Sequence, residues 1–406
     1  MINIIGLGYI GLPTALMFAK SGVKVVGTDK NIKLVESLNQ GKLNFEEKGL
    51  EELFQEALSN GIEFTTEYQK THTYIIAVPT PYIKESKKLD SKYVVSAVNS
   101  VLDVCENGAI LIIESTIAPG TIDKYLRPEI EKRGFVIGED IHLVHAPERI
   151  IPGNMIYELE HNSRTIGADS QEIGGKVKRL YSNFCKSEIV VTDIRSAEMS
   201  KVVENTYRDI NIAFSNELAK ICNKDNMDVY EIIRIANKHP RVNILQPGPG
   251  VGGHCIPVDP WFLVGDYPDL TDLILTARKI NDSMPNHVLG RIRDIMLEHE
   301  IQDISKIGLY GLSYKENVDD IRESPTLQLL EQMNNHLAFG VKVFDPFVKT
   351  KIIDGQVLDF GEFLDGIEII VIMVGHKHIK DNINLIKNKF ILDTKNVCEL
   401  EGVYKL

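Results

Sequence analysis

The first twenty residues constrain the fold more than any other part of the chain. A short apolar run, residues 2–5, is followed at once by the pattern G-x-G-x-x-G at Gly6, Gly8 and Gly11, and then by a mostly apolar stretch. In a strand–turn–helix unit the first glycine makes the tight turn, the second lets the backbone approach a pyrophosphate, and the third allows close packing of the helix on the sheet. The start of the helix adds N–H groups and the positive end of its dipole. The pattern predicts a dinucleotide-binding unit.

An acidic residue indicates which dinucleotide is bound. Asp29 stands at the end of the next expected strand, 18 residues after Gly11. A carboxylate at this place accepts hydrogen bonds from the ribose hydroxyls and repels a 2′-phosphate, which favours NAD over NADP. Two alternatives stay open: a glycine turn in a sheet that binds nothing, and FAD, although nothing downstream resembles a flavin domain.

The first half of the chain alternates short apolar runs with helical stretches such as residues 12–21 and 91–105, which we expect to be amphipathic. This alternation predicts an α/β fold with a doubly wound parallel sheet. The expected strands are residues 2–5, 23–28, 74–78, 109–114, 141–145, 164–168 and 189–192.

The pattern changes in the middle of the chain and then returns. Residues 196–224 contain no Gly or Pro and carry apolar residues at helical spacing, which predicts one long helix that joins two domains. Further helices are expected at 229–238 and at 269–300, the second broken or kinked at Pro285. Strands are then expected at 306–310, 341–344, 368–374 and 390–393. We therefore expect two Rossmann-like domains, residues 1–195 and 301–406, joined by the long helix and a helical middle domain, residues 196–300.

Composition excludes some classes of function. The chain has 406 residues and a net charge of -12, which disfavours nucleic-acid binding because that needs an excess of Lys and Arg facing the phosphates. No apolar run reaches the ~18 residues of a membrane span, and the N-terminus does not resemble a signal peptide. Five scattered cysteines show no metal-like pairing and favour a reducing, cytoplasmic setting. We expect no metal and no membrane partner.

The densest cluster of glycines surrounds a thiol. Residues 247–260 read PGPGVGGHCIPVDP, so four glycines leave little bulk around Cys255, and Asp259 follows near an expected helix start. A substrate could come close to this sulfur, although a lone cysteine is otherwise a small buried hydrophobe. On the long helix, Lys201, Asn205 and Arg208 share one face by their spacing, which suits an anionic ligand or simply a solvated surface.

Polar residues also follow the expected strands, where ligands of open α/β sheets bind. Thr80 and Thr116 could reach a cofactor with their hydroxyls, or be ordinary turn and cap residues. Glu148, in the segment APERI, could act as a base, or form a surface ion pair with Arg149. A second glycine turn, residues 308–315, with Lys315 and the later Arg322, predicts a second anion site.

Taken together, these motifs resemble the nucleotide-sugar 6-dehydrogenases, the UDP-glucose/GDP-mannose dehydrogenase family, over essentially the whole length and in the family's order. They are GLGYIGLP, VPTP, ESTIAPGT, PER, AEMSKVVENTYRDINIAFSNEL, GVGGHC and GLSYKENVDDIRESP. The UDP-glucose members read GGSCFPKD where this chain has GGHCIPVD, and Pro-Glu-Phe where it has Pro-Glu-Arg. These departures, with residues 258–262 and 276–282, look like the N-acetylhexosamine branch. The implied substrate is UDP-N-acetyl-D-mannosamine, with UDP-N-acetylglucosamine as the close alternative.

The resemblance implies a four-electron oxidation of C6 of the sugar with NAD, through a thiohemiacetal and a thioester on Cys255, for surface polysaccharide synthesis. It implies that Lys201 is the general acid/base or alkoxide stabiliser, Asn205 an oxyanion partner and Glu148 the base for hydrolysis. Asp259 and Thr116 would position the water.

The resemblance also implies the binding residues and a homodimer formed through the long helix. Residues expected to hold NAD, besides the three glycines, are Tyr9, Ile10, Asp29, Thr80, Thr116 and Arg322. Residues expected to line the UDP-sugar are Arg149, Ile150, Lys201, Asn205, Arg208, Gly252, Tyr314 and Lys315, joined by His239 and Arg241, often across a dimer interface.

Two other functions remain as alternatives. A two-electron NAD-dependent hydroxyacid dehydrogenase would use Lys201 and Asn205 without a covalent thiol, and would release one NADH for each substrate. A non-catalytic sensor of nucleotide sugars would bind its ligand equally well after Cys255→Ser.

Overall fold

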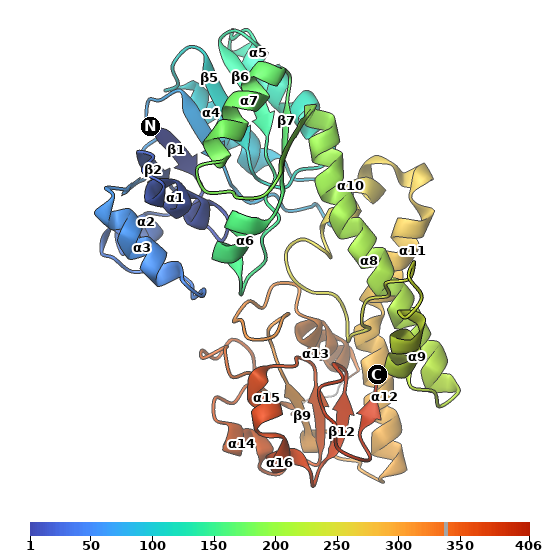
Figure 1. The fold of residues 1–406 in the computed structure, drawn as a ribbon. Coiled ribbons are helices and arrows are strands. Elements are labelled where there is room, and N and C mark those ends of the chain that lie inside the picture. The colour runs from blue at the N-terminus through green and yellow to red at the C-terminus, as the bar shows by residue number, and fades with distance from the viewer. Residues whose placement is uncertain (337–339) are drawn as a thin grey trace. The chain divides into compact units, whose positions relative to one another are not determined.

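The computed structural model describes residues 1–336 and 340–406, and groups them into two compact units, residues 1–204 and 205–406 (Figure 1). The expected division into three domains stays a prediction. The α/β class with Rossmann-like parallel sheets is confirmed.

The first unit is built on an eight-stranded sheet in the order β3-β2-β1-β4-β5-β6-β7-β8. Neighbouring strands run parallel except β6 and β7, which pair antiparallel. The sheet is therefore not wholly parallel as expected, and β3 was not predicted. The strands are β1 Ile2–Ile5, β2 Val25–Thr28, β3 Glu63–Thr65, β4 Thr73–Ile76, β5 Ala109–Ile113, β6 Ile141–His145, β7 Arg164–Ala168 and β8 Ile189–Thr192.

Helices surround this sheet, and the first of them is buried. The helix α1 (Gly11–Lys20) contacts α3 and α6 as well as the sheet, so residues 11–19 are all buried and the expectation of an amphipathic helix was wrong. The other helices of the unit are α2 Ile32–Asn39, α3 Leu50–Ser59, α4 Lys92–Leu102, α5 Arg127–Lys132, α6 Met155–His161 and α7 Gln171–Tyr181, with a π-helical turn at Ile122–Leu126.

The predicted long helix is α8 (Ile194–Lys224), 31 residues in one run, whose first residues belong to the first unit and whose remainder belongs to the second (Figure 1). The predicted break near Pro285 is confirmed, because α11 ends at Asp282 and α12 begins at Met284 with this proline in its first turn. The helices that follow α8 are α9 Val229–Ala236, α10 Asp259–Asp266, α11 Asp272–Asp282 and α12 Met284–Glu298, with a 3-10 turn at Pro268–Leu270.

A five-stranded sheet in the order β10-β9-β11-β12-β13 completes the second unit, and all its neighbouring strands are parallel. Only the short last strand was not predicted. The remaining elements are a 3-10 turn at Ile304–Lys306, β9 Ile307–Tyr310, α13 Pro325–Asn335, β10 Lys342–Phe344, α14 Phe360–Leu364, β11 Ile369–Ile372, α15 Lys377–Asp381, α16 Ile383–Ile386, β12 Phe390–Asp393 and β13 Tyr404–Lys405.

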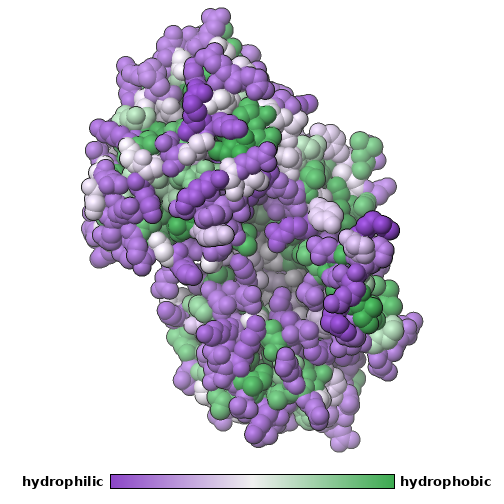
Figure 2. All heavy atoms as spheres, viewed as in Figure 1, coloured by the Kyte–Doolittle hydropathy of each residue, from purple (hydrophilic) through white to green (hydrophobic). Residues whose placement is uncertain are grey.

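Each unit buries apolar side chains on its own sheet. The first core includes Leu7, Leu12 and Phe18, and the second includes Leu309, Leu329 and Val371. The surface in Figure 2 is mostly hydrophilic, with apolar residues in separate patches. Within the two described ranges, none of the helices has the length and apolar character needed to cross a membrane.

Candidate active site

The three glycines of the first turn have three different surroundings. A Cβ atom on Gly6, whose φ is +89°, would lie 2.5 Å from the carbonyl oxygen of Ala77, and one on Gly11 would lie 1.8 Å from the carbonyl oxygen of Gly6. A Cβ on Gly8 would meet no protein atom within 4 Å. The first and third glycines are therefore needed for packing, whereas the second leaves open space in which a pyrophosphate can approach the backbone. This cradle fits NAD.

Asp29 is joined to this cradle. One oxygen of its half-buried carboxylate accepts a hydrogen bond from the Leu7 N–H at 2.8 Å, and the other accepts one from the Asn31 N–H at 2.8 Å. Because the carboxylate is fixed beside the glycine turn and partly exposed, its remaining lone pairs can accept hydrogen bonds from ribose hydroxyls.

The other residues expected to hold NAD in this unit lie at the turn or after strand ends. The ring of Tyr9 stacks on Phe45, with 4.3 Å between ring centroids, and Ile10 directly precedes α1 without a capping hydrogen bond from its side chain. Thr80 is buried beyond β4, and Thr116 is half-buried beyond β5. Their contacts with a cofactor stay predictions.

The thiol loop packs against the turn that follows β9. A Cβ on Gly252 would lie 2.7 Å from Cβ of Tyr314, and one on Gly253 would lie 2.8 Å from the ring of the same tyrosine. The N–H of Gly253 donates to the carbonyl oxygen of Arg322 at 2.9 Å. The glycines therefore let the loop lie directly against Tyr314, one of the residues expected to bind the UDP-sugar.

Cys255 itself is half-buried, at the turn that leads into α10. Its carbonyl oxygen accepts hydrogen bonds from the N–H groups of Val258 and Asp259, at 3.1 and 2.8 Å. These bonds hold Cys255 one turn before a helix start, in a residue that is partly exposed.

Two of the residues expected to act in catalysis, Asn205 and Asp259, are in contact in the second unit. The side-chain amide of Asn205 on α8 donates to Oδ2 of Asp259 at 2.6 Å, and both residues are buried. Lys201, one turn earlier on α8, is also buried, but Arg208 is exposed. The expected polar face is therefore divided: Lys201 and Asn205 face the protein interior, and Arg208 faces solvent.

Residues of the second expected anion site hold one another in place. The Arg322 guanidinium donates to both carboxylate oxygens of Asp320, at 2.9 and 2.6 Å. The Tyr314 N–H donates to the Asp320 carbonyl at 2.9 Å, and the Lys315 carbonyl accepts from the Ser313 hydroxyl at 2.9 Å. The loop that carries Tyr314, Lys315 and Arg322 is thus well ordered by its own hydrogen bonds.

The segment after β6 places Glu148 and Arg149 in different environments. Glu148 is 7% exposed, and its Oε1 accepts a hydrogen bond from the Arg149 N–H at 2.7 Å. The Arg149 side chain pairs instead with Glu204 at 2.5 Å and donates to the Ser163 carbonyl at 2.8 Å. The alternative of a surface ion pair between Glu148 and Arg149 is wrong, because Glu148 is buried. Ile150 is buried beside them.

Sequence reasoning missed several buried polar residues of the first unit. Arg164 at the start of β7 contacts both Glu114 and Glu148. His145 ends β6 with Nδ1 2.9 Å from the Ile113 carbonyl oxygen, and burial lowers the pKa of His145 to about 3, so the ring is neutral. Burial raises the pKa of Glu198 to about 7. The sequence offers one signal for them: Glu114 directly follows the apolar run 109–113, and Arg164 directly precedes the mostly apolar run 165–168.

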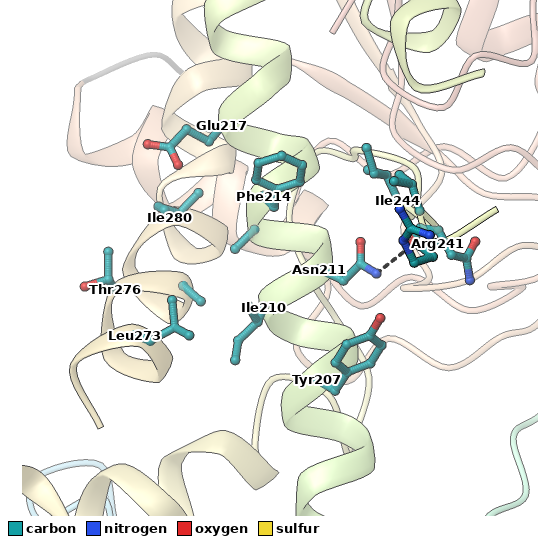
Figure 3. Close-up of a pocket in the computed structure, with 14 residues that line it drawn as sticks. Tyr207, Ile210, Asn211, Phe214, Glu217, Arg241, Ile244, Leu273, Thr276 and Ile280 are labelled. Carbon is teal, nitrogen blue, oxygen red and sulfur yellow. Dashed lines mark hydrogen bonds between the residues drawn. The ribbon is translucent and has the colours of Figure 1, made fainter. Parts of the chain in front are cut away.

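An apolar groove lies along α8 and α11. It has a volume of about 470 Å³. In Figure 3, Tyr207, Ile210 and Phe214 of α8, and Leu273, Thr276 and Ile280 of α11, line it. Arg241 and Ile244 border it from the loop after α9. Tyr207, Phe214 and Leu273 are 50–67% exposed, which is unusual for large apolar side chains gathered in one place.

Comparisons with known proteins agree along the whole chain. Residues 1–185 match the NAD binding domain of the UDP-glucose/GDP-mannose dehydrogenase family, residues 195–283 its central domain, and residues 308–400 its UDP binding domain. These three domain models follow one another in order and together cover most of the sequence.

Individual relatives carry more specific names. A UDP-N-acetyl-D-mannosamine dehydrogenase of Methanocaldococcus jannaschii is 42% identical, over 98% of this chain and 93% of its own length. An NDP-N-acetyl-D-galactosaminuronic acid dehydrogenase of Ralstonia nicotianae is 38% identical, over 99% of this chain and 97% of its own. The structure of the UDP-N-acetyl-mannosamine dehydrogenase of Staphylococcus aureus is 43% identical and superposes with a TM-score of 0.89, covering 100% of this chain and 97% of that one.

Proposed function

Since the chain belongs to the UDP-glucose/GDP-mannose dehydrogenase family, we propose that it oxidises C6 of UDP-N-acetyl-D-mannosamine to the uronate with two molecules of NAD. The similar proteins of M. jannaschii and S. aureus, which are named for this sugar nucleotide, support the choice of substrate. The observation that carries the proposal is the half-buried Cys255 on a glycine loop that packs against Tyr314, in the unit that also holds the Asn205–Asp259 pair.

The thiol divides the oxidation of an alcohol to an acid into two similar steps. The first glycine turn and Asp29 would hold NAD, which would supply the hydride acceptor for C6 in each step. After the first step the Cys255 sulfur adds to the aldehyde carbon, forming a C–S bond and a thiohemiacetal. Loss of the second hydride from this carbon, together with the proton of its hydroxyl, leaves a thioester. Water then adds to the thioester carbonyl, the C–S bond breaks, and the uronate and the thiolate are released.

The surrounding residues move protons and stabilise charge. Lys201 takes the proton of the C6 hydroxyl when its side chain is the neutral amine, or stabilises the forming alkoxide when its side chain is the ammonium. The Asn205 amide, oriented by Asp259, donates to the oxyanion of each tetrahedral intermediate. Glu148 removes a proton from the attacking water, which Asp259 and Thr116 position.

We propose that the residues expected to line the sugar nucleotide bind it, together with residues of a second copy of the chain. The cations and amides of this proposed binding site come from Arg149, Lys201, Asn205, Arg208, Lys315 and Arg241. Ile150, Gly252, Tyr314 and His239 complete its surface. The groove supports the homodimer, because it exposes Tyr207, Phe214 and Leu273 and is bordered by Arg241, a residue expected to reach the ligand of the partner copy.

A second sugar is supported by one finding. The relative named for N-acetyl-D-galactosaminuronic acid is nearly as similar to this chain. The second candidate substrate is therefore a nucleotide of N-acetylgalactosamine, which like N-acetylmannosamine is an N-acetylhexosamine. In either case the product is an activated donor of a uronic acid, which suits the synthesis of a surface polysaccharide.

The test of substrate and mechanism is a panel of sugar nucleotides. UDP-N-acetyl-D-mannosamine, UDP-N-acetylgalactosamine, UDP-N-acetylglucosamine and UDP-glucose are offered separately while NADH and the uronate are measured. We expect the first to react fastest.

The covalent step is tested by substitution of the thiol. Cys255→Ser should abolish uronate formation and keep UDP-sugar binding, whereas Cys105→Ser, at another half-buried thiol, should leave turnover unchanged. Normal turnover by Cys255→Ser would refute the covalent step.

The dimer has a test of its own. Phe214→Glu places a charge in the groove and should convert the dimer to monomers in light scattering, with loss of activity. Leu297→Glu changes an apolar residue that is 78% exposed elsewhere and should leave the dimer intact. A wild-type chain that is monomeric at micromolar concentration would contradict the dimer.

A further inference from the structure

A single buried cation joins two carboxylates at one edge of the first sheet. The side chain of Arg164 is 3% exposed. Its Nη1 donates to Oε1 of Glu114 at 3.1 Å, and its Nη2 donates to Oε2 of Glu148. The guanidinium lies 4.2 Å from the ring centroid of Tyr181, whose hydroxyl donates to the same Glu114 oxygen at 3.1 Å. The hydrogen bonds between Arg164 and the two carboxylates are therefore shielded from solvent.

The reversal of β7 brings Arg164 to this edge. The strands β6 and β7 pair antiparallel, with Val144 opposite Ala168 and His145 opposite Gly167. Extending this register three residues beyond His145 sets Glu148 opposite Arg164, the first residue of β7. In a wholly parallel sheet the first residue of a strand would lie at the amino edge, away from Glu148 and from the carboxylate that follows β5.

Both oxygens of the Glu148 carboxylate are occupied by donors. Oε1 accepts from the Arg149 N–H and Oε2 from Arg164, and the side chain is 4% exposed. Two donors from different directions fix the plane of a carboxylate, and a charge-assisted bond from a guanidinium stabilises its ionised form. The carboxylate is thus held in one orientation and ready to accept a proton.

The second carboxylate balances the cation when Glu148 is neutral. Burial raises the pKa of Glu114, and the Arg164 charge opposes that rise. A buried guanidinium left without an anion would be costly. When Glu148 accepts a proton from water, Arg164 keeps Glu114 as its partner and stays charged.

We propose that Arg164 is a positioning residue for hydrolysis of the thioester, holding the ionised Glu148 in place while Glu114 anchors the guanidinium. The inference rests on the proposed function, in which Glu148 is the base. In that step Glu148 takes a proton from water, the water oxygen bonds to the thioester carbon, and the C–S bond breaks to release the Cys255 thiolate. Arg164 neither gains nor loses a proton.

The first test separates hydrolysis from oxidation. Arg164→Lys and Arg164→Met should still release a rapid burst of two NADH per active site, followed by a steady rate that falls ~10- to 100-fold, since general bases contribute ~10²–10⁴. Mass spectrometry of the protein should show the acyl adduct on Cys255. Lysine should recover part of the rate because it keeps the charge. Equal loss of burst and steady rate in a folded variant would overturn the proposal.

A second variant keeps the proposal testable if Arg164→Met does not fold. Arg164→Lys weakens the bond to Glu148, so the acid limb of the hydrolysis rate should move to higher pH. Glu114→Gln leaves the whole guanidinium charge to Glu148, so the same limb should move to lower pH. Shifts in the same direction, or none in either variant, would overturn the proposal.

The matched control is Arg127, which also bridges two carboxylates of the first unit, Asp123 and Asp169, but has a side chain that is 23% exposed. Arg127→Met should leave burst, adduct and pH profile unchanged, and an adduct that accumulates in it would overturn a specific role of Arg164. A wild-type enzyme that releases only one NADH per sugar would refute the proposed function instead.

Discussion

The two sheets begin with the same turn, and the differences between the turns show what each unit is built to do. In both, a glycine with positive φ follows the first strand, and its N–H donates to the end of the neighbouring strand: Gly6 to Thr28 and Gly311 to Phe344, each at 2.8 Å. In both, an aspartate follows that neighbouring strand and accepts the N–H of the residue after the glycine, Asp29 from Leu7 and Asp345 from Leu312.

From this common start the two turns diverge. In the first unit the chain enters α1 within a few residues, and Asp29 keeps part of its carboxylate exposed. In the second unit a long loop that carries Tyr314 and Lys315 precedes α13, and Asp345 is fully enclosed. It accepts four backbone N–H groups and lies 3.2 Å from Nε2 of His376. The first aspartate therefore remains available to a ligand, whereas the second holds the fold and leaves ligand binding to the loop.

The largest expected effect comes from the glycines of the first turn. Gly11→Ala would place a Cβ 1.8 Å from the carbonyl oxygen of Gly6, so we expect it to cost more than ~3 kcal/mol of folding free energy. Gly8→Ala has open space around it and should fold normally while NAD affinity falls. Urea unfolding and NAD titration distinguish the two. Equal stability of both variants would contradict the assignment of one glycine to packing and the other to the ligand.

Next in size is the effect of removing the enclosed aspartate. Asp345→Ala leaves buried N–H groups without an acceptor and should destabilise the second unit by ~3–5 kcal/mol. Calorimetry should show a lower melting temperature, with NAD affinity of the folded protein unchanged. A variant as stable as the wild type would show that Asp345 does not hold this turn together.

The corresponding change in the first unit should affect binding more than folding. Asp29→Ala loses the acceptor of two N–H groups, one of them on the buried Leu7, and also the carboxylate that accepts from the ribose. We therefore expect NAD affinity to fall ~10- to 100-fold and stability to fall by ~1–2 kcal/mol, less than in Asp345→Ala. Asp29→Asn should keep part of the affinity. Unchanged NAD binding in Asp29→Ala would remove this residue from the cofactor site.

The last effect concerns pH, appears only over a limited pH range, and has opposite signs in the two units. Burial raises the pKa of Glu198 to about 7, so its contribution to stability is complete below its unfolded pKa and is lost as pH rises through 7. Burial alone would raise the pKa of Asp345, but the bonds from His376 and from N–H groups lower it to about 2, so its contribution is complete above its unfolded pKa and is lost as pH falls through 2.

The two pKa shifts correspond to ~2–3.5 kcal/mol at most. The stability of Glu198→Gln should therefore lose the wild-type decline between about pH 4.5 and pH 7, and Asp345→Asn should lose the decline between about pH 4 and pH 2. Unfolding measured across these ranges provides the check. A wild-type decline that persists in Glu198→Gln would assign the pH dependence to another group.

Much of this account was predictable from the sequence because it depends on local patterns. The glycine turns, the long α8 and the break before α12 follow from glycine spacing, helical periodicity and one proline. The direction of β7 was not predictable, because a short apolar strand reads the same whether it runs parallel or antiparallel. The cluster around Arg164 was missed for that reason. The groove was not predictable either, because it depends on which faces of α8 and α11 lie side by side, and this is decided by tertiary packing.

The proposed chemistry depends on a thiol that retains the aldehyde between two oxidations, and the most direct test counts electrons. UDP-N-acetyl-D-mannosamine is supplied in limiting amount with excess NAD, and NADH is measured together with the acidic product. The account predicts two NADH for each sugar nucleotide consumed, with the uronate as product and no aldehyde released. One NADH for each substrate, with the aldehyde or another two-electron product accumulating, would contradict it.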